Sequence, residues 1–156
     1  YEATSIRSTW DSGSTWNREH VWPQSKLDSK ADNSKTNSAS DLHNLKPADP
    51  GENTSRSNDW FGETGVSNSY EPRDEVKGDI ARILFYMDIM YSDLSLIYAN
   101  DGGVYEMGNL EVLLAWHELD PVDSFEMNRN NLIEGYQGNR NPFIDHPEFV
   151  EQIWGN

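Results

Sequence analysis

The sequence contains no cysteine and no long apolar run, and each absence excludes a class of protein. Without cysteine, the chain can have neither disulfide bonds nor thiolate metal sites. No stretch approaches the roughly 20 apolar residues that a membrane-spanning helix needs, so we expect no membrane partner. No leader peptide is recognisable, and because the chain opens on Tyr1 we expect a mature or trimmed form that has lost its leader.

Basic residues are also scarce. The chain has 12 Lys and Arg against 27 Asp and Glu, a net charge of −15, which disfavours polyanionic partners such as nucleic acids. The imbalance is uneven: residues 1–70 hold 10 acidic and 7 basic residues, whereas residues 71–156 hold 17 and 5. The first half is therefore close to neutral and can still present a local phosphate-binding face.

The composition is that of a folded protein, with 35% hydrophobic and 12% aromatic residues in a chain of 156. This length suits a single domain spanning 1–156. The first 70 residues are rich in Ser, Thr, Asn, Asp and Gly and lack helical periodicity, so we expect short strands and ordered loops there. Residues 28–40 are the most loop-like stretch.

The pattern changes at Pro72, after which apolar residues recur at three- and four-residue steps and predict an amphipathic helix that Asp101 ends. The recurring residues are Val76, Ile80, Ile83, Leu84, Met87, Met90, Tyr91 and Leu94. GNLEVLLAWHEL and DSFEMNRNNLIEGY predict two further helices, and HPEFVEQIW predicts a short last one. We therefore predict an α+β fold, with a strand-bearing N-terminal half packed against a mainly helical C-terminal half.

The segment WNREHVWPQS places Glu19 beside His20, between two tryptophans. A neutral histidine is a natural general base near pH 7, and a carboxylate suits a hard cation such as Mg²⁺. Each residue also has a plainer interpretation, His20 as a structural or surface histidine and Glu19 as a surface charge or cap. Neighbours on a strand point to opposite faces, so both can serve one site only if the strand is twisted or bulged.

A second segment, SDLHNLKPADPGENTSRSNDWFG, spans residues 40–62. It predicts an extended piece over 42–45 that carries Asn44, then a turn, then a short helix over about 52–60. Asn53 would lie in the first turn of that helix. Asn53 also opens an Asn-Thr-Ser glycosylation sequon, or it serves only to start the helix. The spacing of the acids excludes an EF-hand calcium loop.

Five motifs in the same order resemble the endonuclease I family of secreted and periplasmic nucleases, which belongs to the ββα-metal (His-Me finger) superfamily. The motifs are WNREHVWPQS, DLHNLKPADPGENTSRSN, GDIARILFYM, WHELDPVDSFE and QGNRNPFIDHPEFVEQIWG. The resemblance runs from about Trp16 to the C-terminus. It implies a His-Me finger core in the N-terminal half, a secreted or periplasmic location, and cleavage of DNA and RNA with little sequence preference.

The resemblance also implies roles for particular residues. His20 matches the general base, while Glu19 and Asn53 match the protein ligands of one divalent ion. That ion is typically Mg²⁺, with Ca²⁺ and Mn²⁺ as alternatives. Hydrolysis of a phosphodiester needs a base to activate water and a cation to stabilise the developing charge, which these groups would provide.

Asn44 matches a position that steadies the loop and the histidine. The family also uses an arginine near the scissile phosphate, and Arg56 is the first candidate because it lies three residues after Asn53 on a neighbouring helical face. Arg140 and Lys46 are the next candidates.

Some other residues have plainer expected roles. We expect His43 to pack in the interior, His117 to cap a helix end at the surface, and at least two of Trp10, Trp16 and Trp22 to lie in the core rather than to stack on nucleobases.

Two other function classes stay open. One is a catalytically silent binding module on the same scaffold, whose acidic surface engages a basic protein or a cell-wall partner. The presence of the base together with both metal ligands disfavours it. The other is a glycosidase, but no pair of carboxylates stands out by spacing. The expected substrates are DNA and RNA, and the expected oligomeric state is a monomer.

Overall fold

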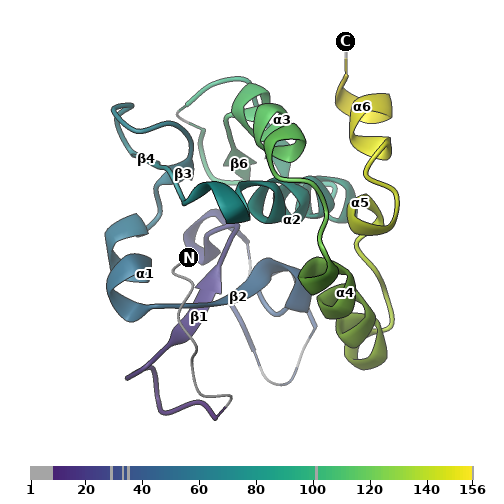
Figure 1. Ribbon diagram of the computed structural model, residues 1–156. Helices are drawn as coiled ribbons and strands as arrows, with labels where there is room; N and C mark the ends of the chain where they lie inside the picture. Colours follow the sequence, from purple (N-terminus) through teal and green to yellow (C-terminus); the bar gives the residue numbers. More distant parts are fainter. Residues whose placement is uncertain (1–8, 29, 33, 35, 101, 156) are drawn as a thin grey trace.

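A long helix, α2 (Lys77–Met90), runs through the middle of the molecule in the computed structural model (Figure 1). The structure describes residues 9–28, 30–32, 34, 36–100 and 102–155. Helix α3 (Leu110–Leu119) lies above α2 in this view, and the last three helices lie to the right. The first two strands and the first helix lie on the opposite side, below and to the left.

The described part of the chain forms three two-stranded sheets, of which the first is antiparallel and the other two are parallel. The pairs are β1 (Asn17–His20) with β2 (Leu45–Ala48), β3 (Trp60–Phe61) with β4 (Ser69–Tyr70), and β5 (Ser95–Leu96) with β6 (Glu106–Met107). The other helices are α1 (Pro50–Arg56), α4 (Ser124–Gln137), α5 (Pro142–Asp145) and α6 (Phe149–Trp154). Short 3₁₀ helices cover Gln24–Lys26 (η1), Leu42–Asn44 (η2) and Asp74–Val76 (η3). The mixture of helices with small sheets is an α+β structure, as predicted.

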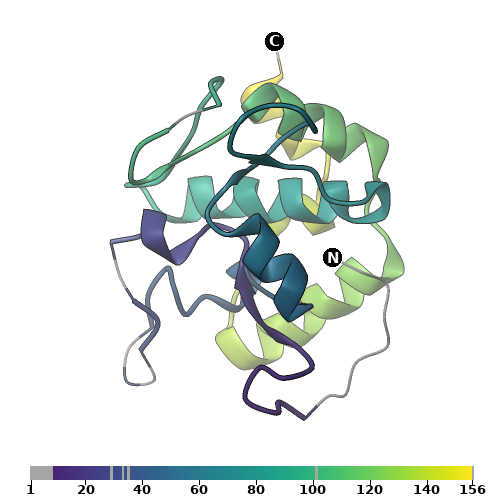
Figure 2. The same cartoon turned by 90° about the vertical axis from the view of Figure 1, so that its left-hand side faces the viewer.

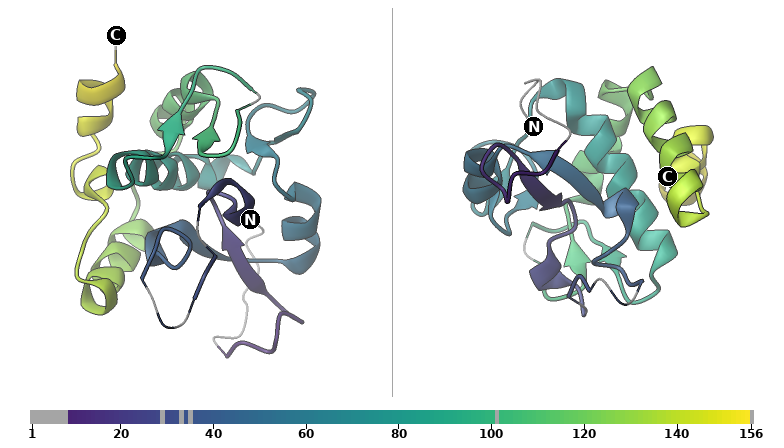
Figure 3. Two further views of the ribbon diagram at one scale, coloured as in Figure 1. Left: turned by 180° about the vertical axis from the view of Figure 1, so that it is seen from behind. Right: turned by 90° about the horizontal axis from the view of Figure 1, so that it is seen from below.

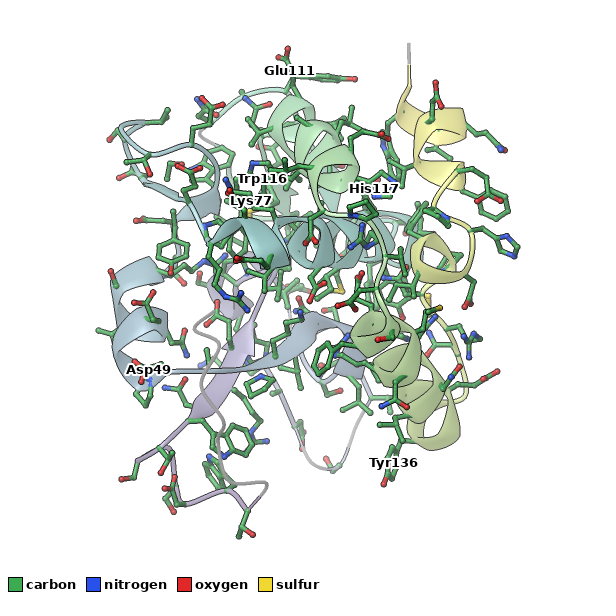
Figure 4. All side chains as sticks on the ribbon, viewed as in Figure 1. Asp49, Lys77, Glu111, Trp116, His117 and Tyr136 are labelled. Carbon is green, nitrogen blue, oxygen red and sulfur yellow. The ribbon has the colours of Figure 1, made fainter. Side chains whose placement is uncertain are left out.

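Strands β1 and β2 and helix α1 form a continuous ββα unit. Helix α1 follows β2 at once and lies beside β1 in Figure 2. Asp49, labelled in Figure 4, caps α1 by accepting hydrogen bonds from the backbone N–H groups of Gly51 (2.8 Å) and Glu52 (3.1 Å). Pro50 occupies the first helical position, where its missing N–H has no cost.

The bounds of this unit differ from the prediction. Helix α1 begins at Pro50 and not at 52, because Asp49 caps it. It ends at Arg56 and not near 60, since Ser57 has a positive φ of 52° and cannot continue a right-handed helix. Most of the extended piece predicted over 42–45 is not extended: Leu42–Asn44 form a 3₁₀ turn, and β2 starts only at Leu45.

Helix α2 is buried on every side from Lys77 to Met87. The predicted helix is therefore present, but the prediction that it is amphipathic was wrong, as was its predicted extent, because it ends at Met90. The reason is its central place: α3 packs on it, and Figure 3 shows β5 and β6 lying against it when the molecule is seen from behind. A helix covered on all sides has no solvent face to keep polar.

Two charged residues of α2 are paired inside the protein. Arg82 is fully buried and donates two hydrogen bonds to the carboxylate of Glu126 on α4, at 2.8 and 2.5 Å. Asp79 forms an ion pair with Lys46 on β2. These contacts tie the central helix to the C-terminal helices on one side and to the ββα unit on the other.

Buried apolar residues from both halves of the chain form one hydrophobic cluster, which includes Trp22 and Phe61 as well as Phe143. Of the three tryptophans considered above, Trp22 is in this cluster, Trp16 is half-buried, and Trp10 is 49% exposed. The expectation that two of the three belong to the core was therefore wrong. None of the helices described by the structure is long and apolar enough to span a membrane.

Replacing Arg82 by alanine should leave the carboxylate of Glu126 buried without a partner. We expect this change to lower the free energy of unfolding by about 3–5 kcal/mol. The matched control is Arg140→Ala, since Arg140 pairs with Asp145 (2.6 Å) nearer the surface, and there the loss should be about 1 kcal/mol or less. Urea unfolding followed by circular dichroism measures both. Equal losses in the two variants would contradict this assignment.

Candidate active site

Glu19, His20, Asn53 and Arg56 line one hollow of about 300 Å³ at the junction of β1 and α1. The remaining lining residues are Arg18, Pro23, Gln24, Ser25, Ser57 and Asn58. The structure therefore brings the predicted base, both predicted metal ligands and the predicted arginine to one place. A larger hollow of about 400 Å³ between the 36–41 loop and the C-terminal end of α2 contains none of these four residues.

Glu19 and His20 reach the same hollow without a bulge in β1. The pairing of β1 with β2 is regular to its last residue, where His20 lies opposite Leu45, so of the two alternatives, a twist or a bulge, the bulge is absent. Glu19 is buried and points to Arg56 of α1, while His20 is half-buried. Because β1 ends at His20 and the chain bends at Val21, side chains from both faces of the strand can border the hollow at this end.

The ring of His20 is held in one tautomer. Its Nε2 lies 2.8 Å from the carbonyl oxygen of Ala39, and a carbonyl can only accept, so Nε2 carries the proton and Nδ1 keeps the lone pair. Burial lowers the pKa of His20 below its ordinary value, and the positive charges of Arg18 and Arg56 lower it further, against the opposing effect of the Ala39 hydrogen bond. The imidazole is therefore neutral at pH 7 and can accept a proton at Nδ1.

The loop that supplies the Ala39 carbonyl is anchored behind the site by Asp41. This buried carboxylate accepts hydrogen bonds, each of 2.8 Å, from the hydroxyls of Tyr86 and Tyr91 and from the side-chain amide of Gln137. These partners come from α2, from the residue after it, and from α4. The orientation of His20 thus depends on helices far along the chain.

Asn44 is fully buried and fastens the segment that follows His20. Its Oδ1 accepts from the backbone N–H of Trp22 at 2.7 Å, and its Nδ2 donates to the carbonyl of Trp22 at 3.1 Å. The carbonyl of Asn44 also accepts from the N–H of Val21 at 3.0 Å. Asn44 lies outside the hollow, in a position from which it holds the backbone beside His20.

Arg56 is 1% exposed, and its guanidinium is bound to other groups of the protein. Nη1 donates to Glu19 Oε1 at 2.6 Å and to the carbonyl of His20 at 3.1 Å, while Nη2 donates to the carbonyl of Val21 at 2.9 Å. This geometry suits a group that positions the carboxylate of Glu19. It leaves little of the guanidinium for a phosphate.

The two other cations considered for the phosphate lie elsewhere. Lys46 is paired with Asp79 in the interior, and Arg140 is bonded to Glu134 (2.8 Å) and Asp145 (2.6 Å) of α4 and α5. Neither lines the hollow.

Sequence reasoning missed Arg18, which is exposed and lines the hollow. The signal was available, because residues two apart on a strand share a face and Arg18 lies two before His20.

The two other histidines considered lie outside the hollow. His43 is buried and packs against Tyr86 with ring centroids 4.5 Å apart, as expected. His117 was expected at the surface, but it is buried against Arg82, with 3.4 Å between Nδ1 and Nη1. That expectation was wrong because α3 packs directly on the central helix.

Asn53 presents an amide oxygen to the hollow. Its Nδ2 donates to Asn17 Oδ1 at 2.7 Å, and its Oδ1 accepts no hydrogen bond from any residue that the structure describes. Glu19 and Asn53 together offer one carboxylate and one amide oxygen, a donor set that fits a hard cation such as Mg²⁺, which takes few protein ligands and retains water. The described residues contain no group of three or more His, Cys, Asp or Glu side chains placed to hold a metal.

The charge of the hollow differs from that of the whole chain. The net charge is −15, yet the lining includes Arg18 and Arg56 against one acid, Glu19, and the other lining side chains, His20 included, are neutral at pH 7. Glu19 is itself paired with Arg56. A phosphate entering the hollow would therefore meet a locally positive surface.

Comparison with known proteins places the chain in a family. The model of the endonuclease I family matches residues 1–70 and 64–148, and the chain belongs to this family. It is 45% identical to the extracellular ribonuclease of Bacillus amyloliquefaciens, over 89% of this chain and 54% of that protein. It is 33% identical to an extracellular deoxyribonuclease of Aeromonas hydrophila, over 67% and 48% respectively. The chain spans about half the length of the curated relatives it matches.

The pKa of His20 should be measurable by NMR titration of its ring, and we expect a value below the ordinary 6.5. The Arg18→Ala change should raise the pKa, because it removes one of the two positive charges that disfavour the imidazolium. As the pH falls below 6.5, the unfolded chain takes up a proton on this histidine before the folded protein does. The free energy of unfolding should therefore decrease with falling pH in this range, whereas above pH 6.5 the contribution of His20 is constant. A pKa at or above 6.5 in the wild-type protein would contradict this description.

Proposed function

We propose that this chain is a divalent-metal-dependent endonuclease that hydrolyses phosphodiester bonds in DNA and RNA with little sequence preference and leaves 5′-phosphate ends. The observation that carries the proposal is the meeting of His20, Glu19 and Asn53 in one hollow at the junction of a strand and a helix. Membership of the endonuclease I family supports it, as do relatives named for ribonuclease and deoxyribonuclease activity. Under this proposal, the ββα unit is the His-Me finger core, and the protein acts outside the cytoplasm, as the names of its relatives suggest.

In the proposed reaction His20 acts as the general base. Its Nδ1 takes a proton from the water that attacks the phosphorus atom, while Nε2–H stays on the carbonyl of Ala39 and keeps the ring oriented. Asn44 acts as a positioning residue, because it holds the backbone next to His20. As the bond from the water oxygen to phosphorus forms, the bond between phosphorus and the 3′ oxygen breaks, and the departing 3′ oxygen takes up a proton from a water molecule to leave as a hydroxyl.

Glu19 and Asn53 would hold one Mg²⁺, with Ca²⁺ or Mn²⁺ as alternatives. A divalent ion bound there would stabilise negative charge on the phosphate and on the departing oxygen. Arg56 positions Glu19 for this task through the 2.6 Å ion pair, a different role from the phosphate contact first expected of it. We assign the phosphate contact to Arg18, whose side chain is exposed at the hollow.

The change His20→Ala should lower kcat on supercoiled plasmid by about 10²–10⁴-fold, the usual contribution of a general base. The fold should persist, since His20 is only half-buried and lies outside the hydrophobic cluster. His146→Ala is the matched control, because His146 is exposed and does not line the hollow; its rate should equal that of the wild type.

Plasmid nicking by the His20 variant at the wild-type rate would remove His20 from the mechanism. Absence of nicking by the wild-type protein with any of the three ions would favour the catalytically silent binding module.

The divalent ion can be tested through Asn53. A chelator should stop cleavage and added Mg²⁺ should restore it. Asn53→Ala should require a higher Mg²⁺ concentration for half-maximal rate, because the ion loses one of its two protein oxygens. Thr54→Ala is the control, since this neighbour on α1 is exposed and its hydroxyl bonds only to the carbonyl of Pro50. Full activity in chelator, or an unchanged Mg²⁺ requirement in the Asn53 variant, would refute the assignment.

A further inference from the structure

Trp10 and Arg18 form a small platform at the edge of the candidate active site. The Arg18 guanidinium carbon lies 4.8 Å from the centroid of the Trp10 ring. Arg18 also lines the hollow that contains His20. Arg18 therefore connects the exposed ring of Trp10 to the hollow in which the proposed hydrolysis would occur. We call these two residues the Trp10–Arg18 platform.

The exposure of Trp10 sets it apart from other tryptophans of the chain. Trp22, Trp60 and Trp116 are buried, whereas Trp10 is 49% exposed and is absent from the hydrophobic cluster. Tryptophan is enriched at interaction sites, because its large ring is apolar while its N–H can still meet a polar partner.

The backbone next to Trp10 is held in place. Asp11 accepts hydrogen bonds from the N–H groups of Ser14 (2.9 Å) and Thr15 (3.0 Å), which closes the turn between Trp10 and β1. The turn brings Trp10 back over Arg18, although eight positions separate them in the chain. The ring is thus presented beside the hollow by a defined turn.

We propose that the Trp10–Arg18 platform binds one unpaired nucleobase next to the scissile phosphate, so that the preferred substrate is single-stranded nucleic acid. The base stacks on the exposed part of the Trp10 ring, and Arg18 contacts the adjoining phosphate. This inference rests on the proposed nuclease function. Every base has a flat π-face, so stacking of this kind accepts any sequence, and a base in a duplex must first leave its own stack.

The charge of the site agrees with this occupant. Arg18 is an exposed cation among the residues that line the hollow, and it adjoins the aromatic ring. Grooves that bind single strands combine such cations along the backbone path with aromatic rings for the bases. An apolar partner would make no use of the cation.

The test is cleavage of an oligonucleotide in which phosphorothioates protect all linkages but one, offered as a single strand and as a duplex. The wild-type protein should cleave the single strand faster. Trp10→Ala should raise KM on the single strand about tenfold, a typical loss for one base stacked on an aromatic ring, and should leave kcat unchanged. Trp10→Phe should retain part of the affinity. On the duplex, Trp10→Ala should raise KM by a smaller factor than on the single strand.

Two controls separate stacking from packing. The first is Tyr136→Ala, which removes another exposed aromatic ring. Tyr136 is 84% exposed and lies at the end of α4, directed away from the ββα unit in Figure 4, so this change should alter the KM on neither substrate. In the second control, the nucleotides beside the cleavable linkage are replaced by abasic residues, one at a time. At one of these positions the wild type and Trp10→Ala should have equal KM values, because no base remains there to stack on the Trp10 ring. An equal loss on both substrates with a lowered Tm would show that Trp10 serves packing, which would overturn the platform.

The outcomes also distinguish this inference from the proposed function. If the wild-type protein cleaves nucleic acid but the Trp10→Ala variant cleaves the single strand with the wild-type KM, the platform is refuted and the nuclease stands. Faster cleavage of the duplex by the wild type would likewise refute the single-strand preference. If the wild type cleaves no nucleic acid with Mg²⁺, Ca²⁺ or Mn²⁺, the proposed function fails and the platform fails with it.

Discussion

The buried ion pair between Arg56 and Glu19 is the contact on which the geometry of the site depends. It joins the last residue of α1 to β1, and the same guanidinium binds the carbonyls of His20 and Val21. Arg56 therefore holds the helix that carries Asn53 against the strand that carries Glu19 and His20. Two charges taken out of water need each other and further hydrogen bonds to be stable, so the burial of this pair keeps the two elements together.

The same physics explains how an acidic protein can present a positive hollow. Asp79 is paired with Lys46 inside the fold, and Glu126 with Arg82, so these buried acids carry their own counter-charges away from the site. Because each pair adds nothing to the net charge, the surplus of acids belongs to other residues. A substrate approaching β1 would meet the local field of Arg18, whereas the surplus of acids lies in residues 71–156.

Much of the candidate site could be predicted from short segments. The pair Glu19-His20 and the residues Asn44 and Asn53 lie in two motifs, and the structure places all four in or beside one hollow. The task of Arg56 could not be read from its helical position, because that depends on what the helix packs against. The burial of α2 was missed for the same reason: a periodic pattern predicts a helix but not how many neighbours cover it.

The sequence by itself determined where most of the helices form, which residue types are available as a base and as metal ligands, and that no thiolate takes part. These properties follow from residue chemistry and from neighbours within about one helical turn. Only the tertiary structure decided that Asn53 meets Glu19, that the carbonyl of Ala39 sets the tautomer of His20, and that Arg18 rather than Arg56 faces the open hollow. Those pairings join residues distant in the chain, and they are selected by the need to bury apolar surface while giving most enclosed polar groups a partner.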